Sequence, residues 1–410
     1  AAHDAQYALA GASAEDKNKM LGAIAKAISG ASGQLLEINK KDVEEAKASG
    51  MSFAMVDRLT LTPERISVMA EGVAQVADLP DPVGEVTEEW TVPSGLHIKK
   101  VRVPLGVIGV IYESRPNVTA DVAALCLKSG NCVVLRGGKD AINSNRAIYN
   151  IIVKAVKESG FDPACVGFID DTSREGSTAL LKQGGYVDVV IPRGGDGLKH
   201  FVLENAVMPV IASAGGVCHF FVEKSANPDK CIPVIENAKM QRPSTCNALE
   251  QLLVQRDIAE KFLPAEIKNL TDKGCRITAC KESKAILDGA GVPCIAATEE
   301  DFKKEHGDYE LTVRVVKDTD EAIAIINANN TAHSDGILSE DKKEIAKFVK
   351  GVDAACVYVN ASTRFTDGFQ FGFGAEIGIS TQKLHARGPL GLKQLTSEKY
   401  IADGDYLSRK

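Results

Sequence analysis

An arginine and a cysteine, Arg242 and Cys246, stand four residues apart in the middle of the chain. Pro243 prevents a helix from continuing through this point, and the serine and threonine that follow are residue types that commonly begin a new helix. We therefore expect Cys246 in or just before the first turn of a helix, where unpaired backbone N–H groups favour a thiolate. A thiolate is a nucleophile, so the segment predicts covalent catalysis. A buried structural cysteine that follows a loop would show the same local pattern.

Two glycine pairs follow predicted strands and could hold a phosphate group. Gly194 and Gly195 precede a predicted helix, whose free N–H groups suit an anion, and Arg136 and Lys139 flank the other pair with positive charge. A complete Gly-x-Gly-x-x-Gly motif does not follow any predicted strand, so the usual dinucleotide fingerprint does not apply. Ordinary solvated turns account for both segments at least as well, which leaves a nucleotide site as one of two interpretations.

A cysteine hydrolase would need a histidine beside Cys246, and His219 and His385 are the candidates. Nothing in the sequence places either histidine near the cysteine. The ten cysteines include no C-x-x-C pair, which gives zinc and thioredoxin-like chemistry no support. A hydrolase therefore remains an alternative without a defined site, and no metal is expected.

The elements that must position these residues alternate between strand and helix in two sets, one on each side of Cys246. The predicted strands are Val107–Tyr112, Cys132–Arg136, Val166–Ile169, Val187–Ile191, Val210–Ala212 and His219–Val222, then Leu252–Val254, Arg276–Ala279, Val313–Val316, Gly336–Leu338 and Ala355–Val359. Such alternation predicts α/β architecture with parallel, doubly wound sheets. Ligands of these sheets bind beyond the carboxyl ends of the strands, where the loops 136–139 and 192–196 lie.

The first hundred residues have a different pattern. Helical periodicity covers residues 3–29, 32–47 and 62–76, and alternation on both sides of Pro93-Ser94-Gly95 predicts a hairpin over residues 88–103. A hairpin beside a compact domain commonly forms an arm that pairs with another subunit. We therefore expect a homo-oligomer.

The composition restricts the partners and the setting. The chain has 410 residues and a formal net charge of −7, which argues against a nucleic-acid or anionic-membrane partner. Its longest apolar region, residues 206–222, is interrupted by proline, serine, glycine and histidine, so we expect no membrane span. Scattered cysteines and a first segment without a signal pattern favour a reducing, cytoplasmic setting.

Longer segments resemble the aldehyde dehydrogenase superfamily in their order and spacing: residues 107–115, 132–139, 187–195, 213–216, 242–248 and 310–315. Five blocks are similar, more closely, to the branch of that superfamily that reduces gamma-glutamyl phosphate: residues 112–119, 241–248, 333–335, 358–368 and 381–389. The likeness covers nearly the whole chain. It implies an α/β fold of two doubly wound domains with a β-hairpin oligomerisation arm.

The same resemblance implies an activity. Members of this branch use NADPH to reduce gamma-glutamyl phosphate (L-glutamate 5-phosphate) to L-glutamate 5-semialdehyde and phosphate, through a cysteine thioester, in L-proline biosynthesis. It implies gamma-glutamyl phosphate as the small-molecule substrate, NADP(H) as the cofactor and glutamate 5-kinase as a functional partner.

The resemblance also assigns roles to residues. It places the nucleophile on Cys246, and we expect the side-chain amide of Asn117 and the Cys246 backbone N–H to hold the oxyanion. The residues expected to bind the cofactor are Arg136, Lys139, Gly194, Gly195 and Glu310. The cations expected to bind the phosphate and the α-carboxylate of the substrate are Arg115, Arg242 and Arg364.

Two departures from the wider superfamily are informative. Hydrolytic relatives carry a glutamate two residues before a Gly-Gly pair, and this glutamate activates water. Ser213 stands at that position here, so water should attack a thioester slowly. Relatives that prefer NAD carry a glutamate that binds a ribose hydroxyl where this chain has Lys139, and the lysine would attract a 2′-phosphate.

By analogy, residues 1–85 and 104–216 form a cofactor-binding domain, residues 217–383 a catalytic domain, and residues 86–103 with 384–410 an arm and tail. Three alternatives remain open at this point. They are a reductase of the same fold that uses coenzyme A thioesters, a non-catalytic nucleotide-binding protein, and the cysteine hydrolase described above.

Overall fold

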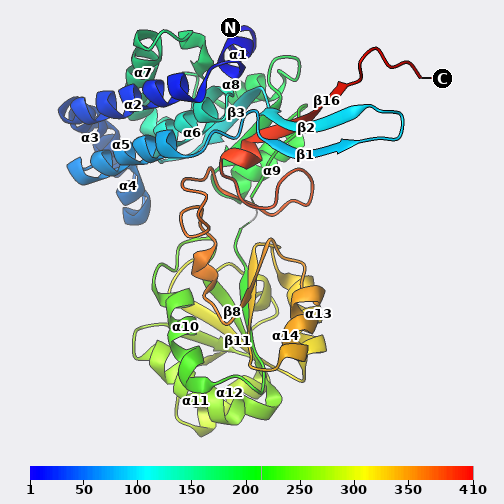
Figure 1. The fold of residues 1–410 in the computed structure, drawn as a ribbon. Coiled ribbons are helices and arrows are strands. Elements are labelled where there is room, and N and C mark those ends of the chain that lie inside the picture. The colour runs from blue at the N-terminus through cyan, green and yellow to red at the C-terminus, as the bar shows by residue number, and fades with distance from the viewer. Residues whose placement is uncertain (214, 410) are drawn as a thin grey trace. The chain divides into compact units, whose positions relative to one another are not determined.

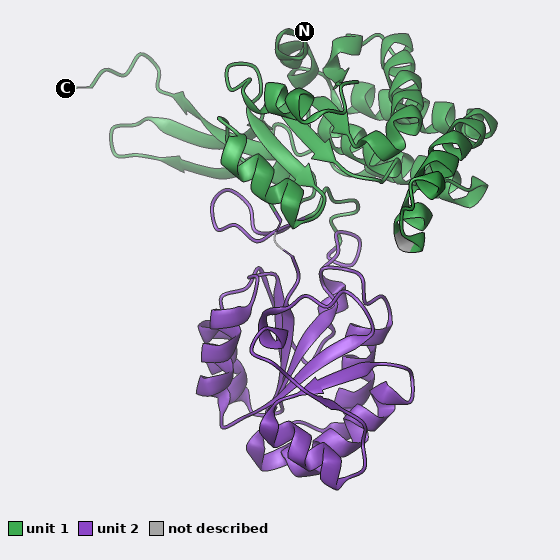
Figure 2. Ribbon diagram, turned by 180° about the vertical axis from the view of Figure 1, so that it is seen from behind, with its two compact units in different colours: residues 1–212, 372–378, 390–410 green, residues 213–371, 379–389 purple. Residues whose placement is uncertain are grey.

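The computed structural model describes residues 1–213 and 215–409. These residues form two compact units (Figure 2). Unit 1 contains residues 1–212, 372–378 and 390–410, and unit 2 contains residues 213–371 and 379–389. Within the described part of the chain, no helix is long and apolar enough to cross a membrane.

Unit 1 is built on a four-stranded parallel sheet with the order β5-β4-β3-β6. Its strands are β3 (Val107–Tyr112), β4 (Cys132–Gly137), β5 (Val166–Phe168) and β6 (Val189–Arg193). The helices that follow these strands are α6 (Asn117–Lys128), α7 (Ile142–Glu158), α8 (Arg174–Leu181) and α9 (Asp196–Asn205), with short 3-10 turns η1 (Lys139–Ala141) and η2 (Pro163–Cys165). All six residues of β3 are buried, which explains why this strand is a continuous apolar run.

Five further helices pack in unit 1 ahead of the sheet: α1 (Ala2–Ala10), α2 (Ala14–Gly30), α3 (Ser32–Ala48), α4 (Phe53–Leu59) and α5 (Pro63–Asp78). Serine or threonine side chains cap the starts of α2, α4 and α5. The sequence pattern predicts α1–α3 and α5 but misses α4, because a helix of seven residues is too short to show a clear period.

The predicted hairpin is present. It pairs β1 (Val86–Thr91) with β2 (His97–Pro104), and β16 (Thr396–Asp403) adds a third antiparallel strand. Trp90 and Tyr400 meet edge to face across this sheet, with ring centroids 6.2 Å apart. The tail therefore joins the hairpin, connected through the 3-10 turn η5 (Leu392–Leu395). Its role as an oligomerisation arm stays a prediction.

Unit 2 contains a seven-stranded sheet with the order β10-β9-β11-β8-β7-β12-β13, in which all neighbouring strands are parallel. The strands are β7 (Cys218–Val222), β8 (Leu249–Gln255), β9 (Arg276–Ala279), β10 (Ile295–Ala296), β11 (Glu310–Val316), β12 (Ser334–Leu338) and β13 (Cys356–Val359). The helices are α10 (Pro228–Met240), α11 (Arg256–Thr271), α12 (Lys281–Gly289), α13 (Thr319–Asn329) and α14 (Lys342–Gly351). Shorter elements are η3 (Asp301–Lys303), η4 (Thr363–Phe365), β14 (Ile379–Ser380) and β15 (Gly388–Pro389).

Helices cover both faces of this sheet, with α10–α12 on one side and α13 and α14 on the other (Figure 1). Neighbouring residues of one strand therefore enter different cores. Phe220 and Leu252 pack with Phe262 of α11, whereas Phe221 and Leu253 pack with Phe348 of α14. The expected α/β fold with parallel, doubly wound sheets is confirmed.

Two local predictions are wrong. Val210–Ala212 is not a strand, because only Val210 forms a bridge, to Val190. The segment after Cys246 is strand β8 rather than a helix. The functional division into cofactor-binding domain, arm and catalytic domain stays a prediction.

One buried carboxyl group stands out in the core of unit 2. The Glu266 side chain on α11 is fully buried, and neither of its oxygens accepts a hydrogen bond from a described residue. Burial raises the pKa of Glu266 to about 8, with a further rise from Glu236 that Lys273 opposes. This carboxyl group is therefore neutral in acid and must ionise inside the core as the pH rises.

We predict that Glu266→Gln stabilises the protein at pH 8 much more than at pH 5. The raised pKa means that the folded protein keeps a proton that the unfolded chain has lost, so stability falls as the pH rises from 4.5 towards 8. Glutamine has the same size and does not ionise, so the gain at pH 8 over pH 5 should be about 3 kcal/mol. Calorimetric melting at both pH values measures it, with Glu260→Gln, a change at an exposed glutamate of the same helix, as the control. An equal effect at both pH values would contradict the prediction.

Candidate active site

Cys246 lies in a tight turn between α10 and β8, and not at the start of a helix. The turn closes with a 2.9 Å hydrogen bond from the Ala248 N–H to the Thr245 carbonyl, and β8 begins at Leu249. The helix expected here does not form because the sheet buries all seven residues of β8. No helix dipole therefore acts on the thiol from this segment, and neighbouring side chains must set its chemistry.

The position of Cys246 is unlike that of the other nine cysteines. It is the exposed one, and the rest are buried or half-buried. Its backbone is held tightly from one side, since a Cβ atom added to Gly216 would lie 1.5 Å from the Cys246 carbonyl oxygen. The Cys218 thiol donates to that same oxygen at 3.2 Å. The backbone of Cys246 is thus fixed although the residue as a whole is exposed.

A histidine that the sequence argument did not single out contacts the sulfur. Nε2 of His333 lies 3.2 Å from Sγ of Cys246. The imidazole is buried, and burial lowers the pKa of His333 to about 4 although the nearby Asp335 opposes this shift. The contact is therefore between the sulfur and a neutral imidazole at physiological pH.

The two histidines considered for a hydrolase do not take this role. His219 is buried in β7, where its Nδ1 lies 3.0 Å from the Asp335 carboxylate, and its backbone N–H donates to the same oxygen at 2.9 Å. His385 is exposed, in the left-handed conformation, in the loop between β14 and β15. The parallel pairing of the strands explains why His333 is the histidine that contacts Cys246. His333 directly precedes β12, and Cys246 shortly precedes β8. The amino ends of these two strands lie at the same edge of the sheet.

Two of the predicted substrate-binding arginines lie beside Cys246. The guanidinium of Arg364, on η4, donates to Thr245 Oγ1 at 2.6 Å, to Gln241 Oε1 at 3.1 Å and to Asn247 Oδ1. Burial and the neighbouring charge of Arg242 lower the pKa of Arg364, whereas Cys246 raises it. All three acceptors are uncharged, and neither arginine forms an ion pair within residues 1–213 and 215–409. Their charge therefore remains available to an anion.

The other predicted residues, apart from Glu310, lie in unit 1 at the carboxyl edge of its sheet. In the strand register Ile111 of β3 is level with Arg136 of β4 and with Pro192 of β6, so the loops after these strands are neighbours. These loops carry Arg115, Asn117, Lys139 and the Gly194-Gly195 pair. The expectation that ligands bind beyond the carboxyl ends is consistent with this arrangement in unit 1.

The residues expected to bind NADP(H) differ in how available they are to a phosphate group. Lys139 is exposed and has no ion pair within the described ranges, which suits a 2′-phosphate. The Arg136 guanidinium is buried and donates to the carbonyl of Ser173 at 2.7 Å, so it supports the loop. At the start of α9 the Gly195 N–H already donates to the Glu113 carboxylate at 3.0 Å. A phosphate at this helix terminus would have to displace that carboxylate.

Asn117 is exposed in the first turn of α6, and its amide donates to Asp121 at 2.8 Å. Burial raises the pKa of Asp121 to about 6, while the bond from Asn117 and the charge of Arg193 oppose the rise. An amide has two N–H donors, so one remains for an oxyanion.

Glu310 opens β11 in unit 2 and is largely buried. Its carboxylate pairs with Arg276, and Nδ1 of His306 lies 3.5 Å from it. Its role toward a ribose stays a prediction.

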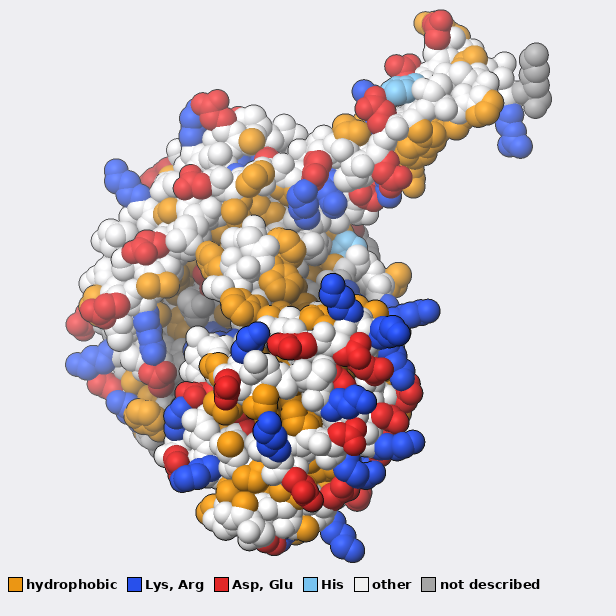
Figure 3. Space-filling model, turned by 60° about the horizontal axis from the view of Figure 1, so that its bottom comes forward, with side chains coloured by type: hydrophobic (Ala, Val, Ile, Leu, Met, Phe, Trp, Pro, Cys, Tyr) orange, Lys and Arg blue, Asp and Glu red, His pale blue; other side chains and the backbone are white. Residues whose placement is uncertain are grey.

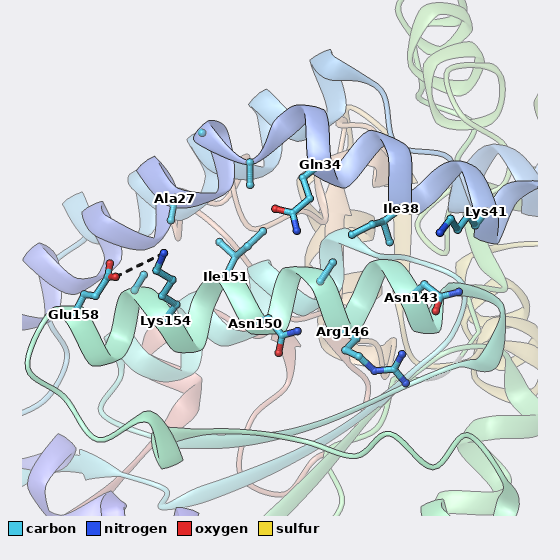
Figure 4. A pocket seen from close by; sticks show the side chains of 14 residues that line it. Ala27, Gln34, Ile38, Lys41, Asn143, Arg146, Asn150, Ile151, Lys154 and Glu158 are labelled. Atoms are coloured by element: carbon cyan, nitrogen blue, oxygen red, sulfur yellow. Dashed lines mark ion pairs between the residues drawn. The ribbon is translucent and has the colours of Figure 1, made fainter.

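A groove in unit 1 lies away from all of these residues. It has a volume of about 690 Å³ and runs between α7 and the helices α2 and α3 (Figure 4). Arg146 and Lys154, which line it, pair with Asp170 and Glu158. None of the predicted site residues lines this groove, and no cysteine, serine or threonine is among the residues that line it, so Cys246 remains the better candidate for covalent chemistry.

Comparison with known proteins identifies the family of this chain. A model of the aldehyde dehydrogenase family, described as "Aldehyde dehydrogenase family", matches residues 1–275 and 311–399. A gamma-glutamyl phosphate reductase of Clostridium perfringens is 52% identical over 404 residues, which cover 98% of this chain and 96% of that protein. The corresponding protein of Caldanaerobacter subterraneus is 49% identical over 409 residues, covering 100% and 98%.

Solved structures give the same result. The crystal structure of gamma-glutamyl phosphate reductase from Thermotoga maritima superimposes with a TM-score of 0.97 at 47% identity and covers 100% of this chain and 98% of that chain. An acetylating aldehyde dehydrogenase from Geobacillus thermoglucosidasius, at 18% identity, TM-score 0.70 and coverage of 100% and 96%, shares the fold. The chain therefore belongs to the aldehyde dehydrogenase family and, within it, to the gamma-glutamyl phosphate reductases.

Proposed function

We propose that this chain reduces gamma-glutamyl phosphate to L-glutamate 5-semialdehyde and phosphate with NADPH, through a thioester on Cys246, as a step of L-proline biosynthesis. The observation that carries the proposal is that the exposed Cys246 lies beside a neutral imidazole and near Arg364, which is itself near Arg242, and that neither arginine forms an ion pair within the described residues. A nucleophile beside cations is what an acyl phosphate requires, since its leaving group is an anion. The names of the relatives support the same substrate.

The residues suggest a sequence of steps. The Cys246 thiolate adds to the acyl carbon, and the C–O bond to phosphate breaks, which leaves a thioester and inorganic phosphate. Arg242 and Arg364 bind the phosphate in this proposal, and Arg115 is a further candidate for the α-carboxylate. The Cys246 backbone N–H and the Asn117 amide would hold the oxyanion. NADPH, when bound, supplies the hydride that reduces the thioester carbonyl, and the C–S bond then breaks to release the aldehyde.

Lys139 would attract the 2′-phosphate of the cofactor, with Arg136, Gly194, Gly195 and Glu310 as further cofactor contacts in the proposal. We further propose a cytoplasmic homo-oligomer with glutamate 5-kinase as functional partner. On the face shown in Figure 3, Lys and Arg side chains are interspersed with Asp and Glu, which suits a small-molecule enzyme better than a nucleic-acid-binding one.

One assay tests the proposed function directly. With glutamate 5-semialdehyde, the purified protein should reduce NADP⁺ over many turnovers only when phosphate is present, which is the reverse of the proposed reaction. If the reduction of NADP⁺ depends on coenzyme A rather than on phosphate, the natural substrate is a coenzyme A thioester and not an acyl phosphate. Continued turnover without either acceptor, beyond a single burst, would contradict the acyl-phosphate assignment.

We predict that Cys246→Ser abolishes turnover while NADPH binding survives, because a serine hydroxyl does not form the nucleophilic anion at neutral pH. Steady-state rates and a fluorescence titration of NADPH measure the two properties. Cys280→Ser is the matched control: Cys280 caps α12 by accepting from the Ser283 N–H, and serine is a good cap, so activity should persist. Activity of Cys246→Ser above a trace would remove this residue from the mechanism.

We predict that Lys139→Glu shifts the preference from NADP toward NAD. The change removes a cation and adds a carboxylate that repels a 2′-phosphate, an effect of about 1–3 kcal/mol, which is roughly five- to hundredfold. The ratio of kcat/KM for the two cofactors measures it. Lys26→Glu, an equal charge change on α2, should leave the ratio unchanged. An unaltered ratio in Lys139→Glu would show that this lysine does not bind the phosphate.

We predict that Ser213→Glu introduces hydrolysis of the thioester. A glutamate there could take a proton from water, so the semialdehyde would be oxidised to free glutamate without phosphate. The unaltered protein should release a single burst of NADPH without phosphate and hold the acyl group on Cys246, which intact mass detects. Ser213→Gln controls for size. Steady turnover of the unaltered protein without phosphate would mean that Ser213 does not prevent hydrolysis.

A further inference from the structure

Three buried hydroxyl groups form a chain that ends on His333. Nδ1 of His333 lies 2.9 Å from Oγ of Ser334, which lies 2.6 Å from Oγ1 of Thr366, which in turn lies 2.6 Å from the phenol oxygen of Tyr358. The residues come from three segments: the start of β12, the loop after η4 and strand β13. The opposite ring nitrogen, Nε2, contacts the Cys246 sulfur. The chain therefore lies behind the imidazole, on the side away from the reacting atom.

The chain is shielded from water. Ser334 is 0% exposed, Thr366 2% and Tyr358 9%. Within the described residues, each hydroxyl of the chain has the neighbours just given and no charged group among its hydrogen-bond partners. A hydrogen bond in such surroundings is strong, and a donor without an acceptor there is costly.

These surroundings give the chain a direction. Each hydroxyl has one proton to donate, and the phenol of Tyr358 has Thr366 as its hydrogen-bond partner within the described part of the chain. The Tyr358 proton therefore goes to Thr366, the Thr366 proton to Ser334, and the Ser334 proton to Nδ1 of His333. The reverse direction would leave the buried phenol proton without a described acceptor. A neutral imidazole that accepts at Nδ1 carries its proton on Nε2.

We propose that Ser334, Thr366 and Tyr358 are positioning residues that hold His333 in the Nε2–H form, so that its imidazole donates a hydrogen bond to the Cys246 thiolate. His333 then stabilises the nucleophile as a donor rather than removing a proton from the thiol as a base. No covalent bond forms or breaks in this step. The burial that keeps the imidazole neutral supports the same assignment, because a neutral ring has a single N–H to place.

Other groups also act on the sulfur, and any pH dependence must include them. The titratable and charged groups that face Cys246 or its immediate neighbours are Arg242, Arg364, Asp367, Cys218, His333, Asp335, Glu250 and Glu305. The arginines attract the thiolate in every variant of the chain. Removal of one of the three hydroxyl groups should therefore weaken thiolate formation without abolishing it.

The first test is the state of His333 itself. Histidine labelled with ¹⁵N gives separate signals for a protonated and an unprotonated ring nitrogen, and His333→Gln identifies the signal among the seven histidines. We expect an unprotonated Nδ1 and a protonated Nε2 in the unaltered protein, and loss of this single form in Ser334→Ala. A protonated Nδ1 would overturn the proposal.

The second test is the alkylation of Cys246 by iodoacetamide as a function of pH, followed on the Cys246 peptide by mass. Ser334→Ala and Tyr358→Phe should alkylate about tenfold more slowly at pH 7, the size expected for a hydrogen bond to a charged group. Their half-maximal rate should move to higher pH, and Ser334→Thr should restore it. Ser339→Ala, at the opposite end of β12, removes a buried hydroxyl bonded to Glu223 and should change nothing at Cys246.

Unchanged alkylation in both Ser334→Ala and Tyr358→Phe, with melting temperatures close to the parent, would overturn the proposal. This inference depends on the proposed function in one respect only: the Cys246 thiolate is taken to be the nucleophile of the reaction. Neither test uses substrate or cofactor, so a failure here would leave the phosphate-dependent assay as a separate result. A failed assay with the expected tautomer would reject the substrate and keep the positioning chain.

Discussion

The contact between His333 and Cys246 depends on a parallel sheet whose strands begin at one edge. Strand β7 separates β8 from β12, yet the residues that precede β8 and β12 meet because all three strands point the same way. The same edge brings Gly216 so near the Cys246 backbone that a side chain could not fit between them. Cys246 of unit 2 therefore lies at the amino edge of its sheet, whereas the loops of unit 1 expected to bind the cofactor lie at a carboxyl edge.

This edge also explains how a buried sheet supports an exposed sulfur. Residues of β7, β8 and β12 pack into two apolar cores, which fixes the strands before any polar group is placed. The polar residues of the edge then satisfy one another: Asp335 binds His219, and Ser334 binds His333 and Thr366. Buried polar groups of this kind are stable only when each has a partner, so the network and the core depend on each other.

Local patterns could predict most of the elements, because strands that are buried on both faces are apolar runs. The expected bounds of β3 and β9 agree with the structure, and the hairpin is found on both sides of Pro93-Ser94-Gly95. The errors come from tertiary context. The short α4 has no visible period, and residues 249–255 join a sheet although Ser244 and Thr245, which precede them, resemble a helix cap.

The candidate site could be predicted in part. The segment around Cys246 is recognisable from its residues, but the histidine that contacts it lies 87 residues further along the chain. Local sequence does not encode the strand order that brings these residues together. Had the order β8-β7-β12 been known, residues just ahead of each strand would have been the natural candidates, and His333 is one of them.

The residues predicted to bind the cofactor phosphate and those predicted to bind the substrate phosphate differ in the acceptors that their N–H groups already have. At the start of α9 the Glu113 carboxylate accepts the Gly195 N–H, so the helix terminus is neutralised by the chain itself. Arg364 instead donates to uncharged oxygens of Thr245, Gln241 and Asn247, and its positive charge persists. A phosphate beside Cys246 therefore meets uncompensated charge, whereas a cofactor phosphate at Gly195 competes with a carboxylate. Under the proposed function, attraction of the cofactor phosphate would come mainly from exposed cations such as Lys139. This is the physical reason for proposing that Lys139 distinguishes NADP from NAD.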